Sequence, residues 1–304
     1  MREILELLGI DKRVQELCLG NIVFFREYSS WEYYGSDDVN LKKNHPYPPL
    51  YLPIIIDYDS TPISYGITKH WFTNRELTFT YMEFSEQFLN AEIARTPDQF
   101  IDNLIFEYYV DSIEDDDIYD NAKQKVLQHL ERNYSFEDIK RISRLNSTER
   151  AELLNSYNER KPLWMYNQNN VGEYTGAFPT AEVLVNQNAF YEAAFYEISH
   201  KEWIGYNTEK KGFSFFKKEP KFKAFDNIPD WLQPKTDKKE LFEKYISTSE
   251  FNKAWLTING PSFSPIEVGE RLQRLKEFSN EKAYHLWADF WCERYGNMDS
   301  FIFI

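Results

Sequence analysis

The sequence predicts an α+β fold, with an antiparallel sheet and flanking helices in the N-terminal half and a mainly helical C-terminal half. In Leu77–Tyr81, large apolar residues alternate with threonines, which is the period-two pattern of a β-strand. In Leu272–Phe278, apolar residues instead recur about three positions apart, as on one face of a helix. We therefore expect residues 20–85 to form the sheet and residues 180–296 to be mostly helical.

Local patterns predict the first elements in order along the chain. Met1–Cys18 carries apolar residues at helical spacing and is expected to be a helix. Leu52–Tyr58 has an uninterrupted apolar centre, which favours a strand that is covered on both faces. Asp59–Pro62 has the composition of a turn, and the next two strands are expected over Ile63–Lys69 and Leu77–Glu83.

Helices are expected to follow the strands. Thr96 suits the cap position of a helix, and Pro97 suits its first turn. A second helix is expected over Asp120–Arg132. Further helical segments are expected across Ser135–Tyr157, because Ser135 stands three residues before an acidic residue, as in a capping box.

A chain of 304 residues is long enough for two domains. Between residues 162 and 179 the composition shifts to Asn, Gln, Gly and aromatic residues, and the boundary is expected between residues 133 and 170. We assign residues 1–135 to an α+β domain and residues 136–304 to a mainly helical domain. The second domain is expected to bury Trp287 and to contain helices over Thr180–His200, Lys235–Ile246, Ser249–Leu256, Pro265–Phe278 and Glu281–Tyr295.

The net charge of −14 narrows the classes of partner. Most of it lies in the first 150 residues, where 16 Lys and Arg stand against 27 Asp and Glu. An acidic surface repels phosphates, so direct nucleic-acid binding is disfavoured. A basic protein partner would instead be attracted and steered, although acidity for solubility alone gives the same total.

Several features favour a cytoplasmic protein with no membrane span. No run of apolar residues approaches the roughly 18 that a membrane helix needs. The N-terminus shows no basic segment followed by an apolar run, so no secretory signal is visible. Cys18 and Cys292 lie far apart among apolar neighbours, and we expect buried free thiols in a reducing compartment rather than a disulfide.

Motifs that carry chemistry are missing. The five histidines are scattered, Cys-x-x-Cys does not occur, and neither a phosphate-binding glycine loop nor a nucleophile elbow is present. We therefore expect no catalytic residues, no metal and no cofactor. The alternative is an uncharacterised, hydrolase-like enzyme whose site is assembled from distant residues such as Asp57, Asp59, His70 and Glu76. A scaffold protein without a dedicated ligand is a third reading.

Partner binding is predicted at two clusters. Six of the ten residues in Asp111–Asp120 are acidic, and Tyr119 is one of the residues that interleave them with apolar or aromatic surface. Tyr and Trp are favoured anchors in protein interfaces, which draws attention to the aromatic cluster near residue 31 as well. A solvated acidic face is the plainer interpretation of the first cluster. The predicted contact residues are Asp111, Glu114, Asp115, Asp116, Asp117, Tyr119, Trp31, Tyr33 and Tyr34.

Three segments together resemble the SUKH (SMI1/KNR4-like) superfamily. They are the aromatic run Trp31–Gly35, the strand Leu52–Asp57 with its following hairpin, and the helix Thr96–Leu104. The resemblance covers about residues 1–135 and implies an α+β domain with a central antiparallel sheet. It also implies a binding role, since bacterial members are commonly immunity proteins that neutralise toxins, and no catalytic residues carry over. The function expected first is a non-enzymatic cytoplasmic protein-binding module. The form that the resemblance implies is an immunity protein that neutralises a basic toxin.

Overall fold

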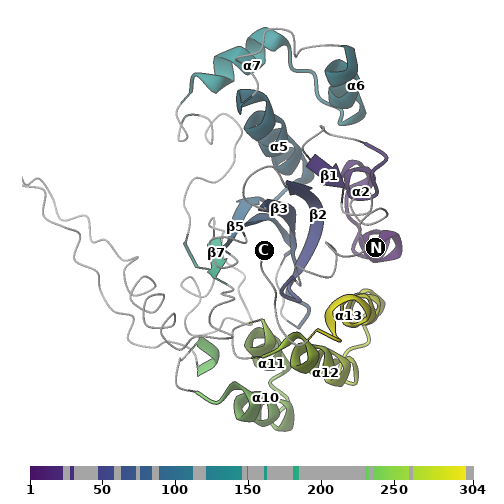
Figure 1. Cartoon of the computed structure of the whole chain (residues 1–304), viewed down its shortest axis with the longest axis vertical. Coiled ribbons are helices and arrows are strands. Elements are labelled where there is room, and N and C mark those ends of the chain that lie inside the picture. Colours follow the sequence, from purple (N-terminus) through teal and green to yellow (C-terminus); the bar gives the residue numbers. More distant parts are fainter. Residues whose placement is uncertain are drawn as a thin grey trace, which may run out of the picture.

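A computed structural model gives the fold of the chain, shown in Figure 1. The structure describes residues 1–22, 28–30, 47–57, 63–72, 76–83, 89–111, 121–145, 149, 161–162, 181–184, 230–232, 236–259 and 263–298.

The centre of the molecule is a seven-stranded sheet with the order β1-β2-β3-β4-β5-β7-β6. Its first five strands are sequential neighbours and pair antiparallel. The α+β fold class and the antiparallel sheet of the N-terminal half are therefore confirmed. These strands are β1 (Tyr28–Ser30), β2 (Tyr51–Asp57), β3 (Ile63–Thr68), β4 (Thr78–Glu83) and β5 (Leu89–Ala94).

Strand β2 is buried on both faces, as its continuous apolar run predicts. Leu52, Ile54, Ile55 and Ile56 are all at most 3% exposed, although successive side chains of a strand point in opposite directions. Helices cover this part of the sheet in Figure 1, and the Cys18 thiol donates a hydrogen bond to the β2 backbone. The continuous apolar run therefore matches a strand whose side chains are buried on both faces.

The N-terminus forms two short helices, so the single helix expected over Met1–Cys18 is wrong. The first, α1 (Arg2–Leu7), ends because Gly9 adopts a left-handed backbone with φ +65°. The second, α2 (Lys12–Cys18), begins because the Asp11 side chain accepts a hydrogen bond from the Arg13 amide at 2.9 Å.

Three helices follow the sheet: α5 (Pro97–Asp111), α6 (Asn121–His129) and α7 (Phe136–Ser143). The cap expected at Thr96 is present, since its hydroxyl accepts the amide of Gln99 while the Gln99 side chain accepts the amide of Thr96. The capping box expected at Ser135 is present too, with Asp138 as its partner. Figure 1 shows α6 and α7 beyond α5, at one end of the molecule.

The C-terminal region is helical where residues 236–298 are described, as predicted. A 3₁₀ turn, η5 (Asp230–Leu232), precedes the helices. Each expected helix has a counterpart that differs by a few residues at its ends. The four helices are α10 (Lys238–Ser247), α11 (Phe251–Ile258), α12 (Pro265–Lys276) and α13 (Lys282–Tyr295).

The helix expected to start at Thr180 is replaced at its beginning by a strand. Residues 181–184 form β7 (Ala181–Leu184), which pairs antiparallel with β5 through Leu89–Ala91. A two-residue strand, β6 (Lys161–Pro162), joins β7 in parallel. Pairing with a strand from the N-terminal half overrides the local helical pattern here.

Helix α13 is hydrogen-bonded to the segment just before β2. The Trp287 indole donates a hydrogen bond to the Pro49 carbonyl at 2.7 Å, and the Trp291 indole donates one to the Tyr47 carbonyl at 2.7 Å. Both tryptophans are at most 1% exposed, which confirms the predicted burial of Trp287. The apolar core runs without interruption from the sheet into these helices. The boundary placed after residue 135 stays a prediction.

Candidate functional site

The partner-binding residues predicted from the sequence lie almost entirely outside the described residues. This holds for Trp31, Tyr33, Tyr34, Glu114, Asp115, Asp116, Asp117 and Tyr119. Asp111 is described and is the last residue of α5. The acidic segment therefore connects the end of α5 to the start of α6, so the described geometry around α5, α6 and α7 bears on the prediction most directly.

Among the described residues of the enzyme alternative, Asp57 and His70 lie at opposite ends of the β2–β3 hairpin. Asp57 pairs with Ile63 at one end of the β2–β3 hairpin, whereas His70 follows the other end of β3. Seven residues of extended chain separate these levels by about 20 Å. The His70 side chain is buried and Glu76 is exposed, while Asp59 lies outside the described residues.

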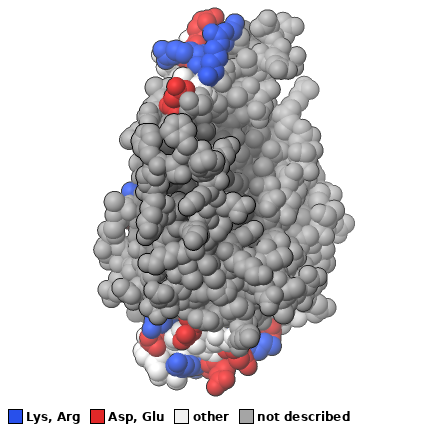
Figure 2. Space-filling model, turned by 90° about the vertical axis from the view of Figure 1, so that its left-hand side faces the viewer, with Lys and Arg blue, Asp and Glu red and all other residues white. Residues whose placement is uncertain are grey.

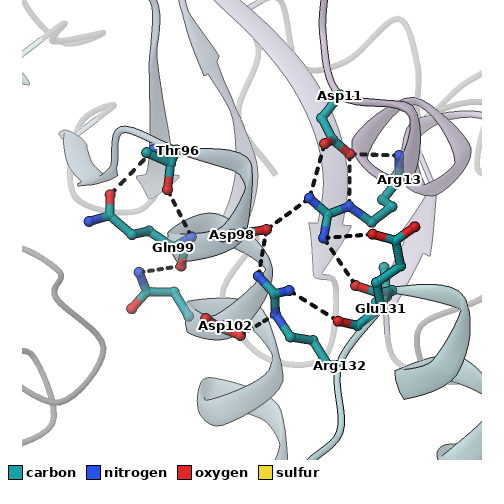
Figure 3. A network of polar contacts seen from close by, with 10 residues as sticks. Asp11, Arg13, Thr96, Asp98, Gln99, Asp102, Glu131 and Arg132 are labelled. Carbon is teal, nitrogen blue, oxygen red and sulfur yellow. Dashed lines mark hydrogen bonds and ion pairs between the residues drawn. The ribbon is translucent and has the colours of Figure 1, made fainter.

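An ion-pair network fixes α6 to the body of the molecule, as Figure 3 shows. Arg13, on α2, donates to Asp11 within its own helix cap and to Asp98 on α5 at 2.8 Å. The same guanidinium donates to the Leu130 carbonyl at 3.3 Å and lies 3.7 Å from the Glu131 carboxylate. One arginine thus joins three elements that are distant in the sequence.

A second arginine, Arg132, completes the network. Its guanidinium lies 2.7 Å from Asp98 and donates to Asp102 at 2.6 Å, so Asp98 stands between two guanidinium groups in Figure 3. The local backbone geometry places Arg132 beside Asp98. Glu131 adopts a left-handed backbone with φ +56°, and the Arg132 amide donates back to the Leu127 carbonyl, which ends α6.

The environment of the network shifts the pKa values of its carboxyl groups in opposite directions. Hydrogen bonds from Arg132 and Arg13 lower the pKa of Asp98, and the hydrogen bond from Arg13 lowers the pKa of Asp11. Burial raises the pKa of Asp102, although Arg132 opposes the shift. Burial and the neighbouring Asp102 also raise the pKa of the Tyr134 hydroxyl, which is hydrogen-bonded to that carboxyl.

A groove of about 540 Å³ opens beside this network, in the angle between α6 and α7. We call it the α6–α7 groove. Leu127, Arg132, Tyr134 and Ser135 form one part of its lining, which we call the wall. Each polar side chain of this wall is engaged: Arg132 and Tyr134 meet Asp102, and the Ser135 hydroxyl donates to Asp138 at 2.6 Å. The wall is therefore held in one arrangement.

The rim of the α6–α7 groove differs from its wall. Gln124, Gln128, Asn133 and Glu137 line it and are exposed. Among the described residues, none of these four side chains forms a hydrogen bond or ion pair. Three carboxamides and one carboxylate therefore remain available to a ligand at the edge of a fixed cavity.

Basic side chains gather at the other end of α7. Lys140, Arg141 and Arg144 occupy the last turn and the C-terminal cap of α7. Figure 2 shows both basic and acidic side chains at each end of the molecule. Cations at a helix C-terminus are favoured by the helix dipole. Arg141 is also 3.5 Å from Asp138. This arrangement is explained by the stability of the helix.

The described part of the chain also bears on metal binding and on membrane spanning. No group of three His, Cys, Asp or Glu residues is placed there to hold a metal ion. None of the described helices is both long and apolar enough to cross a membrane. Cys18 is buried, Cys292 is half-buried, and neither forms a disulfide.

Comparisons of the chain with models of known protein families, with characterised proteins and with solved structures give no match. The resemblance to the SUKH superfamily therefore stays an expectation.

Sequence reasoning missed the α6–α7 groove and the two arginines behind it. Arg13 and Arg132 are separated by more than a hundred residues, and a single sequence carries no signal that they share Asp98. A partial signal existed in the rim, because Gln124 and Gln128 lie four residues apart on a predicted helix and thus on one face.

Proposed function

We propose that this protein is a non-enzymatic, cytoplasmic protein-binding module whose partner is basic. In the reading that the SUKH resemblance suggests, it is an immunity protein and the partner is a basic toxin domain. The net negative charge of the chain, and its concentration in the first half, support attraction of such a partner.

The α6–α7 groove is the observation that carries the proposal. It lies on the helix that begins at Asn121, directly after the acidic segment in the chain. An acidic stretch that leads into an open polar groove combines long-range attraction with a place for close contact. Ligand sites are typically concave and carry a few well-placed polar groups, and the volume of this groove is within their usual range.

The rigid support of the groove also favours binding. Arg13 and Arg132 tie the α6 end to α2 and α5, so the wall does not have to be ordered when a partner arrives. A surface that is already in its bound arrangement loses less entropy on association.

Capture from the native organism tests the proposal. The full chain is immobilised and the retained protein is identified, in parallel with the variant Asp115→Asn/Asp116→Asn/Asp117→Asn. We expect a basic partner whose association with the triple variant is slower, while its dissociation changes less, because rim charges act mainly on the encounter. The matched control is Glu240→Gln/Glu243→Gln on α10, since both residues are exposed at the opposite end of the molecule.

An acidic partner would contradict the proposal. So would an association rate at low salt that is the same for the triple variant and the original chain. In that case the acidic segment is a solvated face and has no part in recognition.

A further inference from the structure

We propose that Asn259 is a deamidation site guarded by the contact between α11 and Leu50, the residue before β2, and that the reaction, once it has occurred, prevents this contact from closing again. The inference stands apart from the proposed function.

The sequence supplies the reactive pair. Asn259 is followed by Gly260, and no other asparagine of the chain precedes a glycine. Deamidation starts when the main-chain nitrogen of the next residue attacks the side-chain carbonyl carbon of an asparagine. Glycine has no side chain to hinder this approach and allows the widest range of backbone angles, so an Asn-Gly pair is especially reactive when it is free to move.

The reaction has two steps that balance without any reagent other than water. The main-chain nitrogen of residue 260 bonds to Cγ of Asn259, the bond from Cγ to Nδ2 breaks, and the amide proton leaves with Nδ2 as ammonia. Water then opens the five-membered imide ring at either of its two carbonyl carbons. The product is aspartate or isoaspartate, in which the main chain runs through the side-chain carbonyl.

The structure holds the side chain of Asn259 at both of its polar atoms. The Oδ1 atom accepts a hydrogen bond from the Leu50 amide at 2.6 Å, and Nδ2 donates one to the Trp255 carbonyl at 2.8 Å. Asn259 is 5% exposed, and both of its partners are at most 1% exposed. Ring closure therefore has to displace the side chain from two buried hydrogen bonds.

The backbone of Asn259 also opposes ring closure. This residue caps the C-terminus of α11 and has a ψ of 3°. At this angle the nitrogen of the next residue eclipses the nitrogen of Asn259 itself. In the imide ring, that nitrogen instead has to lie close to the plane of Cα, Cβ and Cγ. The main chain has to rotate about ψ first, so the folded chain reacts only when this contact opens.

The products do not fit the contact that Asn259 makes. An aspartate keeps an acceptor for the Leu50 amide but loses the N–H that is donated to the Trp255 carbonyl. It also brings a negative charge to a place where both neighbours are buried, which is unfavourable unless the charge is paired. Isoaspartate adds a carbon to the main chain and shifts the side chain from both partners. Either product therefore weakens the tie between α11 and Leu50.

Peptide mapping by mass spectrometry tests whether the contact guards the reaction. The full chain is incubated at neutral pH, folded or in urea, and the reacted fraction at Asn259 is followed with time. The variant Trp287→Phe removes the hydrogen bond to the Pro49 carbonyl, next to Leu50, and leaves the reactive pair unchanged. The matched control is Ile139→Ala, a loss of buried volume on α7.

We expect the chain in urea to react roughly thirtyfold faster than the folded chain or more, which is the factor that two ordinary hydrogen bonds represent. Folded Trp287→Phe should react about fivefold faster than the original chain, whereas folded Ile139→Ala should stay within about twofold of it. Equal rates in urea and in the folded chain would overturn the inference. So would a Trp287→Phe chain that reacts no faster than Ile139→Ala, because the contact of Leu50 would then not be the guard.

The variant Asn259→Asp tests whether the product weakens the contact. Its matched control is Asn252→Asp, the same change at a half-buried position in the first turn of α11, where an acidic residue suits the helix dipole. We expect Asn259→Asp to unfold at a lower urea concentration than the original chain, or not to fold at all, and Asn252→Asp to keep the original midpoint. An unchanged midpoint for Asn259→Asp would show that a carboxylate fits the contact, and the inference would fail.

Discussion

Replacement of Trp287 gives the sharpest test of the packing between the two halves of the chain. Its indole is 1% exposed, stacks on Phe290 with ring centroids 5.6 Å apart, and donates a hydrogen bond to the Pro49 carbonyl at 2.7 Å. Trp287→Ala removes this buried surface and leaves a cavity, so we expect a loss of about 3–5 kcal/mol in the free energy of unfolding.

The variant Trp287→Phe isolates the hydrogen bond. It leaves the Pro49 carbonyl buried without its donor, which should cost about 1–3 kcal/mol beyond the loss of ring volume. Trp255→Phe is the matched control, because Trp255 is as deeply buried but its indole N–H has no hydrogen-bond partner among the described residues.

Urea unfolding followed by fluorescence and circular dichroism measures both variants by linear extrapolation. We expect Trp287→Phe to be the less stable of the two by at least 1 kcal/mol, a margin set by the lost hydrogen bond. If Trp287→Phe loses no more free energy of unfolding than Trp255→Phe, the hydrogen bond to Pro49 does not stabilise the packing of α13. If Trp287→Ala loses less than about 1 kcal/mol, the side chain is not buried.

Three further variants test local features by urea unfolding. Gly66→Ala should cost about 3 kcal/mol or more, because a Cβ there would lie 2.3 Å from the Leu52 carbonyl oxygen; a loss within about 0.5 kcal/mol would refute the close approach. Ser249→Gly should stabilise the chain by about 0.5–1 kcal/mol, since Ser249 has a φ of +58°, and a lower midpoint would contradict this. Burial lowers the pKa of Lys238 from 10.5 to about 8, so the unfolded chain binds more protons between these values and this lysine makes stability rise with pH across them. Lys238→Met should remove that rise and gain about 2 kcal/mol at pH 7, because the charging cost of about 3 kcal/mol exceeds the roughly 1 kcal/mol lost with the hydrogen bond that Lys238 donates to the Asp230 carbonyl. Parallel pH profiles for variant and original chain would contradict the shift.

Helices of the C-terminal region were predictable because their signals are local. The region around Ser264 shows this well: a serine cap, a proline in the first helical position and Glu267 three residues after the cap all stand in the printed sequence. The break within Met1–Cys18 was also visible in principle. Gly9 is a residue that commonly ends a helix, and Asp11 is one that commonly begins the next. The apolar periodicity on both sides of these residues favoured one continuous helix instead.

Features set by contacts distant in sequence were not predictable in the same way. The strand Ala181–Leu184 forms because it pairs with Leu89–Ala91, and no local secondary-structure preference predicts that pairing. The same holds for Asp98, which is shared by Arg13 and Arg132 from two other helices. The α6–α7 groove depends on that network, so its wall is a product of tertiary structure, whereas its glutamines follow from helical spacing alone.

The salt dependence of association tests the central claim most directly. The association rate constant of the captured partner is measured at 0.1 M and 1 M salt, where the Debye length is about 10 Å and 3 Å. With the original chain we expect the constant to fall steeply between these conditions, and with the chain neutralised at Asp115, Asp116 and Asp117 we expect a clearly smaller fall. A rate constant that is independent of salt, or equally dependent in both chains, would contradict the account of an acidic surface that recruits a basic protein.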